Sequence, residues 1–357
     1  MLSRVANCLY WMNRYLERAE NVARILDVNL QLLLDFRNLD DQRLAEHWVP
    51  IIKSTGDDGL FFQLYKEIRG QTVTEFLTFQ NGNPNSIISC IAQARENARM
   101  VRDQISGEMW EEINRLHLFL KSSKAREIWN SAPYDFYQEI KTSSLYLCGL
   151  TDATIRQNEH WHFIQLGKYL ERADKTTRIL DVRSHTFSPE GASAMKSQTA
   201  SLEWAAVLRS CSAWDAYRQI HSADVDPARV AEFLLLSDEF PRSVRFCLTE
   251  LDAALRRVSG VAPRNFSNEA EKLSGRLLSE VQFNTIQEIL KQGLHDYLDQ
   301  LQLRFNQIGE ALFAVYIFQP FNDLSHDILQ QQQQQQQQTR LPSLNLKPEP
   351  RVLDPLQ

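Results

Sequence analysis

The chain has 357 residues, with 39 Lys and Arg against 45 Asp and Glu, so its formal net charge is −6 (39 − 45). Hydrophobic residues make up 43% of it, which excludes a disordered chain, and the acidic balance excludes a general nucleic-acid-binding surface, which needs a basic excess. All 12 glycines and seven of the 12 prolines precede residue 310, so we expect a soluble, mostly α-helical protein.

Apolar residues recur at helical spacing along most of the chain, and the fold class they predict is all-α. Earlier helices are expected at about 3–37, 41–53, 59–68, 72–80, 85–105, 107–120 and 134–156. Later helices are expected at about 158–185, 196–221, 227–237, 241–259, 268–291 and 293–317. Proline, whose missing amide hydrogen costs little at a helix start, stands at or just before four of them: Pro84, Pro133, Pro227 and Pro241.

Two of the expected helices carry nearly the same sequence. YLERAENVARILDV at 15–28 and YLERADKTTRILDV at 169–182 share ten identical residues in fourteen positions. Two further pairs match in the same order along the chain. The offset between the copies grows from 154 in the first pair to 157 in the last. These pairs are Trp48–Ser54 with Trp204–Ser210, and Val73–Cys90 with Val230–Cys247. Three colinear matches indicate an internal duplication.

The duplication predicts one helical domain over residues 1–319, built from two pseudo-symmetric halves of about five or six helices each. The halves are expected at about 1–155 and 156–319, a period too long for a solenoid array. Residues 320–357 contain five prolines and a glutamine run from Gln330 to Gln338, with no apolar periodicity after Leu329. We expect this segment to be a disordered, Gln/Pro-rich tail.

No feature of the chain predicts a membrane protein or a secreted one. Arg4, Asn7 and Arg14 interrupt the amino-terminal stretch, and the most apolar segment, 311–318, is far shorter than the roughly 20 residues of a membrane span. The five cysteines are odd in number, widely spaced and without a CxxC pair. Buried, reduced thiols in a cytoplasmic protein are therefore expected.

The repeated helices place the same charged residues at equivalent positions. Glu17-Arg18 in the first copy and Glu171-Arg172 in the second are identical, although the residues around them have drifted apart. On a helical wheel Glu17 lies outside the apolar arc and Arg18 borders it. Because the pair is nevertheless kept in both copies, we expect it to be constrained and partly buried. Such a pair could pin the two halves together, or it could line a polar cleft that grips a carboxylate or phosphate. Both uses remain open.

Further charges follow the motif in each copy. Arg24 stands four residues after Glu20, and Arg178 stands four residues after Asp174. Pairs at this spacing on a helix surface contribute only about 0.2–0.5 kcal/mol each. They are expected either to form a surface ladder or to extend the site of the Glu-Arg pairs.

A second basic cluster lies on the helix expected over 85–105. Arg95, Arg99 and Arg102 are spaced i, i+4, i+7 and would share one helix face. The pattern fits an anion-binding face as well as it fits a solvated face interleaved with acids. Trp110, which follows, is expected to anchor the core.

Four features together carry a family resemblance, and the resemblance covers essentially all of residues 1–319. These features are the twin YLERA helices, the opening Leu2–Ala6, Arg95–Arg99 and the Pro241-Arg242-Ser243 turn. The chain resembles the bacterial alpha-E domain proteins, an all-helical family named for its glutamate-arginine motif. The resemblance assigns that motif to Glu17, Arg18, Glu171 and Arg172.

The resemblance also implies a functional setting. Members of this family are typically encoded beside, or fused to, a circularly permuted ATP-grasp protein, often near a transglutaminase-like protease and a proteasome-related peptidase. This setting implies synthesis or modification of a peptide, without an established reaction for the helical protein.

A search for catalytic signatures finds none. The chain has no glycine-rich phosphate loop, no G-x-S-x-G and no H-E-x-x-H. Glu159 and His162 form its one Glu-x-x-His spacing, whereas a di-iron bundle needs two such motifs and two further carboxylates. We therefore expect no metal site and no cofactor.

We expect a non-catalytic or assisting partner of an ATP-grasp peptide ligase, which binds a partner or an anionic ligand and neither nucleic acid nor membrane. One alternative is an enzyme that transfers an acyl or aminoacyl group in a cleft between the halves, where burial would raise the pKa of Glu17 or Glu171 for acid–base work. Another is a structural scaffold without a ligand site. The candidate binding residues are Glu17, Arg18, Arg24, Glu171, Arg172, Arg178, Arg95, Arg99 and Arg102.

Overall fold

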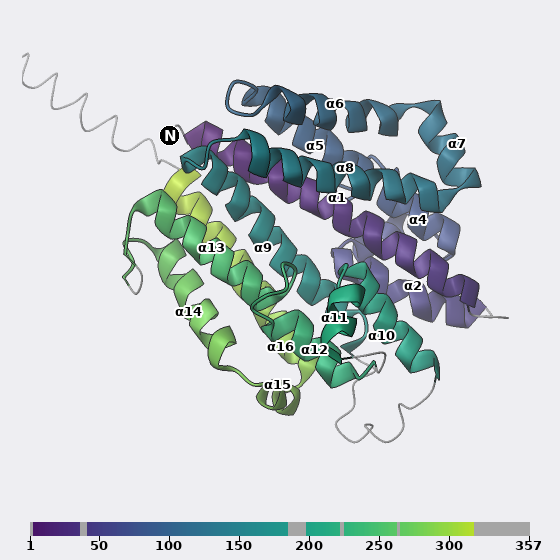
Figure 1. The fold of residues 1–357 in the computed structure, drawn as a ribbon. Coiled ribbons are helices and arrows are strands. Elements are labelled where there is room, and N and C mark those ends of the chain that lie inside the picture. Colours follow the sequence, from purple (N-terminus) through teal and green to yellow (C-terminus); the bar gives the residue numbers. More distant parts are fainter. Residues whose placement is uncertain (1–2, 36–40, 185–197, 222–224, 263–264, 318–357) are drawn as a thin grey trace, which may run out of the picture. The chain divides into compact units, whose positions relative to one another are not determined.

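Two long helices, α1 (Ser3–Asp35) and α9 (Glu159–Asp181), lie side by side at the centre of the fold and run in the same direction (Figure 1). The computed structural model describes residues 3–35, 41–184, 198–221, 225–262 and 265–317, and within these ranges every regular element is helical. The expected tail lies outside them. None of the described helices combines the length and the apolar composition that a membrane crossing requires.

The helices that follow α1 surround it. α5 and α8 pack along α1, and α6 packs on both of them. The bounds of these helices are α2 Asp41–Thr55, α3 Asp58–Leu64, α4 Gly70–Thr78, α5 Ile87–Met100, α6 Gly107–Lys121, α7 Ser123–Ser131 and α8 Pro133–Thr154.

The helices that follow α9 surround it in a similar way. α13 and α16 pack along α9, and α14 packs on both of them. α10 contacts α1 and α2 contacts α9, so each part of the chain also touches the other part's central helix. The bounds are α10 Gln198–Ser210, α11 Trp214–His221, α12 Pro227–Leu236, α13 Val244–Ser259, α14 Glu269–Phe283, α15 Ile286–Gln292, α16 Leu294–Leu312 and the short π-helix η3 Phe313–Ile317.

The all-α prediction is confirmed, but several expected helices are shorter or divided. The helix expected over 196–221 breaks at Ser212, whose φ of 53° is left-handed, and the helix expected over 268–291 breaks where Thr285 caps α15. α5 ends at Met100, short of the expected 105, and α7 was not predicted. The described residues thus form eight α-helices before residue 156 and eight after it, where five or six were expected in each half.

Positions that match in the sequence repeat have matching local structure. Ser86 and Ser243 cap the amino ends of α5 and α13, each with its hydroxyl oxygen accepting a backbone N–H three residues later. The thiols of Cys90 and Cys247 each donate to the carbonyl oxygen of the proline six residues earlier. All five cysteines are unpaired. These parallels agree with an internal duplication, which itself stays a prediction.

The two central helices approach each other closely at Gly167 of α9. A Cβ atom on Gly167 would overlap the carbonyl oxygen of Tyr10 on α1. Only a residue without a side chain allows the two backbones to meet at this distance. Gly167 therefore determines the spacing of α1 and α9, and with it the position of every side chain that joins them.

We expect Gly167→Ala to destabilise the protein by about 1–3 kcal/mol or more, because the helices must separate to accommodate the methyl group. Alanine is otherwise the better helix former, by about 1 kcal/mol. Gly149 of α8 provides the matched control, since a Cβ there meets nothing within 4 Å. Gly149→Ala should leave stability unchanged or raise it, as measured by urea denaturation. Equal effects of the two substitutions would contradict the close crossing.

Candidate functional site

The four motif residues meet between α1 and α9, and their ion pairs cross from one helix to the other. Nε of Arg18 donates to Oε1 of Glu171 at 2.7 Å, and Nε of Arg172 donates to Oε1 of Glu17 at 3.0 Å. Glu17 is only 3% exposed and Glu171 is fully buried. The sequence predicted that these side chains meet. The wheel placed Glu17 outside the buried arc because it assumed one buried face, whereas α1 is covered on several sides.

Glu171 is held by three cations. Nε of Arg14 donates to its Oε2 at 2.6 Å, and Nζ of Lys175 lies 3.6 Å from its Oε1, in addition to the bonds from Arg18. Burial alone would raise the pKa of Glu171, but the charges of Arg18, Arg14 and Lys175 outweigh it and hold the pKa well below its usual range. The expectation of a raised pKa is therefore wrong for Glu171, which stays ionised.

Glu17 and Glu20 of α1 share a cation from the other part of the chain. Arg242, in the turn before α13, places Nη1 3.6 Å from Oε2 of Glu17 and Nη2 2.5 Å from Oε1 of Glu20. Nε of Arg24 also donates to Glu20, at 2.7 Å. Burial alone would raise the pKa of Glu20, but the charges of Arg242 and Arg24 outweigh it and lower the pKa to about 2. Glu20 is fully buried, so of the two alternatives its pair with Arg24 extends the site of the Glu-Arg pairs and does not form a surface ladder.

Sequence reasoning missed several members of this network. Asn85 accepts a bond from Nη1 of Arg18 at 2.7 Å, and it occupies the position in the first copy that Arg242 occupies in the second. Both follow a proline in matched turns, a signal that could have identified them. Arg14 could have been found four residues before Arg18, on the same helix face.

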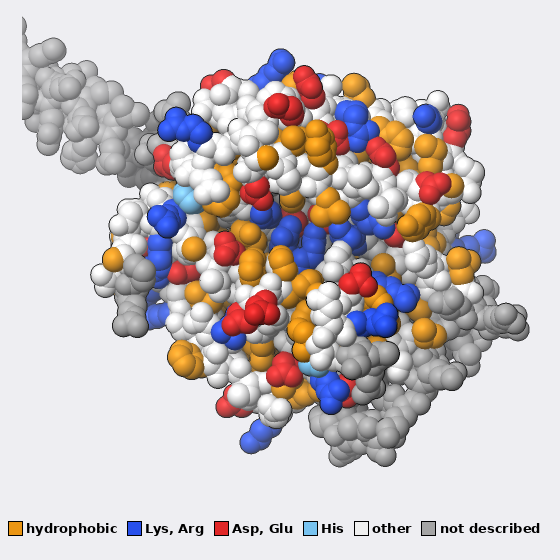
Figure 2. Space-filling model, in the orientation of Figure 1, with side chains coloured by type: hydrophobic (Ala, Val, Ile, Leu, Met, Phe, Trp, Pro, Cys, Tyr) orange, Lys and Arg blue, Asp and Glu red, His pale blue; other side chains and the backbone are white. Residues whose placement is uncertain are grey.

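The network carries more positive than negative charge. Among the described residues, seven cations contact four carboxylates, which leaves a net charge of +3 (7 − 4). The cations are Arg14, Arg18, Arg24, Arg172, Lys175, Arg178 and Arg242, and the carboxylates are Glu17, Glu20, Glu171 and Asp174. Figure 2 shows Lys and Arg side chains gathered in a band across the molecule, between the helices labelled α8 and α12 in Figure 1.

Two neighbouring cavities lie beside this network and share Arg178 and Ser54 in their walls. The smaller has a volume of about 20 Å³, room for one water-sized group, and Arg18, Lys175 and Arg178 all line it. The larger has a volume of about 520 Å³ and lies among residues of α2, α9 and α16. A ligand in the larger cavity could therefore extend an anionic end toward Arg178.

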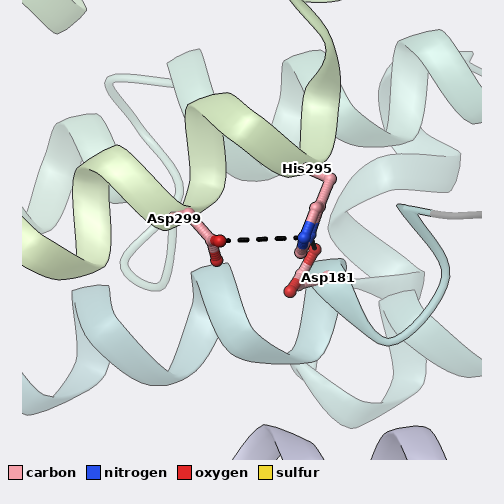
Figure 3. A group of neighbouring side chains, drawn as sticks. All are labelled: Asp181, His295 and Asp299. Carbon is pink, nitrogen blue, oxygen red and sulfur yellow. Dashed lines mark hydrogen bonds and ion pairs between the residues drawn. The ribbon is translucent and has the colours of Figure 1, made fainter.

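His295 of α16 lies between two carboxylates on the wall of the larger cavity (Figure 3). Its Nδ1 is 2.7 Å from Oδ1 of Asp181, and its Nε2 is 3.7 Å from Oδ2 of Asp299. Asp181, His295 and Asp299 each offer one potential ligand atom, and these three atoms lie within 4.8 Å of one another. The group could hold a divalent metal ion if the hydrogen bond between His295 and Asp181 were broken. The sequence search for metal ligands missed it because Asp181 and His295 are 114 residues apart. That hydrogen bond and the charge of Asp181 raise the pKa of His295, although burial opposes them.

The second basic cluster lies apart from the paired helices. Arg95 and Arg99 both contact Glu96, and Arg102 lies beyond the end of α5. The guanidinium groups of Arg95 and Arg102 lie 5.5 Å and 5.2 Å from the ring centroid of Trp110, which packs against the core as expected. In the described part of the chain, no ion pair joins these arginines to the four motif residues.

The low pKa of Glu20 makes acid stability depend on this residue. Above the ordinary glutamate pKa of about 4.5, the ionised carboxylate of Glu20 contributes its full stabilisation to the fold. That stabilisation, about 3 kcal/mol, is lost as the pH falls toward about 2. We expect Glu20→Gln to lower the free energy of unfolding at pH 7 by about 3–5 kcal/mol, because Arg242 and Arg24 lose their partner. Between pH 5 and pH 3 the stability of the Glu20→Gln variant, measured by guanidinium denaturation, should fall less steeply than that of the unsubstituted protein.

The matched control is Glu96→Gln, because the side chain of Glu96 is 48% exposed. We expect that change to stay within about 0.5 kcal/mol of the unsubstituted protein at every pH. The same acid profile in the Glu20 and Glu96 variants would contradict the assignment.

His295 makes the opposite contribution to pH dependence. Because its pKa is raised in the fold, the protonated imidazole stabilises the protein below the ordinary histidine pKa of about 6.5, and the effect disappears as the pH rises through the raised value. Its side chain is 60% exposed, so we expect His295→Gln to cost no more than about 1 kcal/mol at pH 6 and nothing at pH 9. Thermal melts at the two pH values measure this, with His160→Gln as the control. A cost that persists at pH 9 would exclude a charge effect.

Comparisons with known proteins agree with this architecture. A family model described as a predicted alpha-helical domain with a conserved ER motif matches residues 1–317. Uncharacterized proteins of Mycobacterium bovis and Mycobacterium tuberculosis are each 28% identical to the chain over 272 residues. The matched region covers 72% of this chain and 30% of the length of each relative, so the chain spans about a third of the length of these relatives. No solved structure matches. The matched model, which includes both pairs of motif residues, shows that the chain belongs to the Alpha-E family.

Proposed function

We propose that this protein is a non-catalytic, assisting partner of an ATP-grasp peptide ligase, and that it binds an anionic group of a partner or substrate beside α1 and α9. The observation that carries the proposal is the surplus of three positive charges in the ion-pair network, whose carboxylates are buried and whose cations are buried or half-buried. Charges removed from water are costly unless they are compensated. A carboxylate or phosphate bound next to the network would supply that compensation.

Arg178 is the side chain best placed to hold such a group. Its Nε donates to Oδ2 of Asp174 at 2.8 Å, and the described residues offer its two terminal nitrogens no hydrogen-bond partner. It lines both cavities, so a ligand in the larger one can reach it. A guanidinium group with a free edge suits a carboxylate, because two parallel hydrogen bonds can form. Lys175 and Arg18, on the wall of the smaller cavity, add to the attraction.

The choice of partner rests on the family setting. An ATP-grasp ligase handles carboxylate and phosphate groups, and a transglutaminase-like protein is a second candidate partner in a cytoplasmic peptide-modifying system. The mycobacterial relatives extend well beyond the matched region, as expected for a domain that works with a neighbouring one. The low pKa of Glu171 does not support the enzyme alternative, because an ionised glutamate held by three cations is a poor proton carrier.

A scaffold without a ligand site is the second candidate, and the crossed ion pairs favour it. All four motif side chains contact the opposite helix, so the motif by itself is fully used in joining α1 to α9. The two candidates therefore differ at Arg178, which a scaffold does not require.

The test is the effect of Arg178→Gln on association with a circularly permuted ATP-grasp protein from the same organism, the partner class that the family resemblance implies. We expect the unsubstituted protein to bind that partner and the variant to bind about tenfold more weakly or worse, as measured by calorimetry, because a charge-assisted contact is lost. Arg99→Gln is the matched control, since the side chain of Arg99 is 56% exposed and lies on α5. It should bind normally.

Both variants should keep the melting temperature within a few degrees, because Asp174 retains Lys175 at 3.3 Å. Failure of the unsubstituted protein to bind the partner would refute the proposal. Equal binding by the Arg178 variant would refute the role of the cavity and support a scaffold.

A further inference from the structure

A third cavity lies between the first turns of α9 and the second half of α13, away from the ion-pair network. Its volume is about 310 Å³, within the usual range for a small ligand. The side chains that matter on its wall are Trp161, His162, Gln165, Glu250 and Arg257. The first two belong to the Glu-x-x-His segment 159–162, which takes no part in the ion-pair network.

The wall of this cavity contains buried polar atoms without partners. Gln165 is 1% exposed, and neither its Nε2 nor its Oε1 makes a hydrogen bond. Nε1 of Trp161 and Nδ1 of His162 also lack partners. Buried groups of this kind are rare in folded proteins because each one forfeits its bonds to water. Four such atoms belong to three residues of one cavity, and a ligand there would satisfy them once these side chains turned toward it.

The same cavity has a negative and a positive side chain near its two ends. Glu250 and Arg257 are seven residues apart on α13, about 10 Å along the helix axis, and the described residues offer neither an ion-pair partner. Burial and the charge of Arg257 both lower the pKa of His162, and burial and the charge of Glu250 both raise the pKa of Tyr169. His162 is thus near Arg257 and Tyr169 is near Glu250. Gln165, between them on α9, lies between the two charges.

We propose that this cavity binds a short zwitterionic peptide of about three residues. Its ammonium group would lie at Glu250 and its carboxylate at Arg257, while the amide of Gln165 would turn to donate to and accept from a peptide bond. An extended chain spans about 3.3–3.6 Å per residue, so three residues match the separation of the two charges. A side-chain amide both donates and accepts in one plane, as a peptide bond does, and both polar atoms of Gln165 are unused here.

The proposal makes a distinctive prediction for Gln165→Met, which replaces the amide with an apolar side chain of similar length. The variant should melt a few degrees higher than the unsubstituted protein, because two unpaired buried groups are removed. It should also bind triglycine and trialanine about tenfold more weakly or worse by calorimetry. Gln302→Met is the matched control, since Nε2 of Gln302 is likewise buried without a partner but lies on the wall of the 520 Å³ cavity. It should bind both peptides normally.

Three further measurements complete the test with the full-length protein. Glu250→Gln and Arg257→Gln should each weaken binding of triglycine, whereas Glu232→Gln, an exposed change on α12, should not. N-acetyl-triglycine amide, which lacks both terminal charges, should bind much more weakly than triglycine. Arg178→Gln should bind triglycine normally, so this site can fail or succeed independently of the function proposed above.

Absence of saturable binding of triglycine and trialanine at millimolar concentration would overturn the proposal. Undiminished binding by the Gln165 variant, or equal binding of the blocked peptide, would overturn it as well.

Discussion

The buried carboxylates of Glu17 and Glu171 are the constraint on which the rest of this structure depends. Each is taken out of water between α1 and α9, and each is compensated by an arginine from the opposite helix. A buried ion pair adds little net stability over an apolar contact, but removing one partner leaves a charge that costs about 3–5 kcal/mol. Arrangements that slide or rotate one helix against the other are therefore excluded. The contact of Gly167 with the backbone of Tyr10 sets the separation at which these pairs form.

The same constraint explains why the network has an excess of cations. Glu171 accepts from Arg14 and Arg18 and also lies near Lys175, and Glu20 accepts from both Arg24 and Arg242. Several arginines around one carboxylate hold it firmly in its ionised form, at the cost of uncompensated positive charge at the edge of the network. That edge is where Arg178 lines two cavities. The architecture and the proposed anion site are thus two consequences of one charge distribution.

α9 supports both proposed sites because different neighbours cover its two ends. Arg178, near its carboxyl end, is close to residues of α2 and α16, whereas Gln165, near its amino end, is close to α13. The crossed pairs lie between them and fix the helix in place. A rigid helix anchored at its middle positions side chains at both ends accurately, which is what small polar sites need.

The helical class and the four motif residues could be predicted from the sequence, because helical periodicity and a long internal match depend on residue order alone. The sequence also pointed to Arg24 and Arg178, whose i,i+4 pairs form as expected. Three-dimensional contacts were needed to show that the motif pairs meet and cross between helices, that Arg242 joins Glu17 to Glu20, and that Glu171 stays ionised. The breaks at Ser212 and Asn284, the grouping of Asp181 with His295 and the unpartnered amide of Gln165 were decided by the tertiary structure too. The physical reason is that burial and pairing depend on which residues from distant parts of the chain approach, and local periodicity carries no information about these partners.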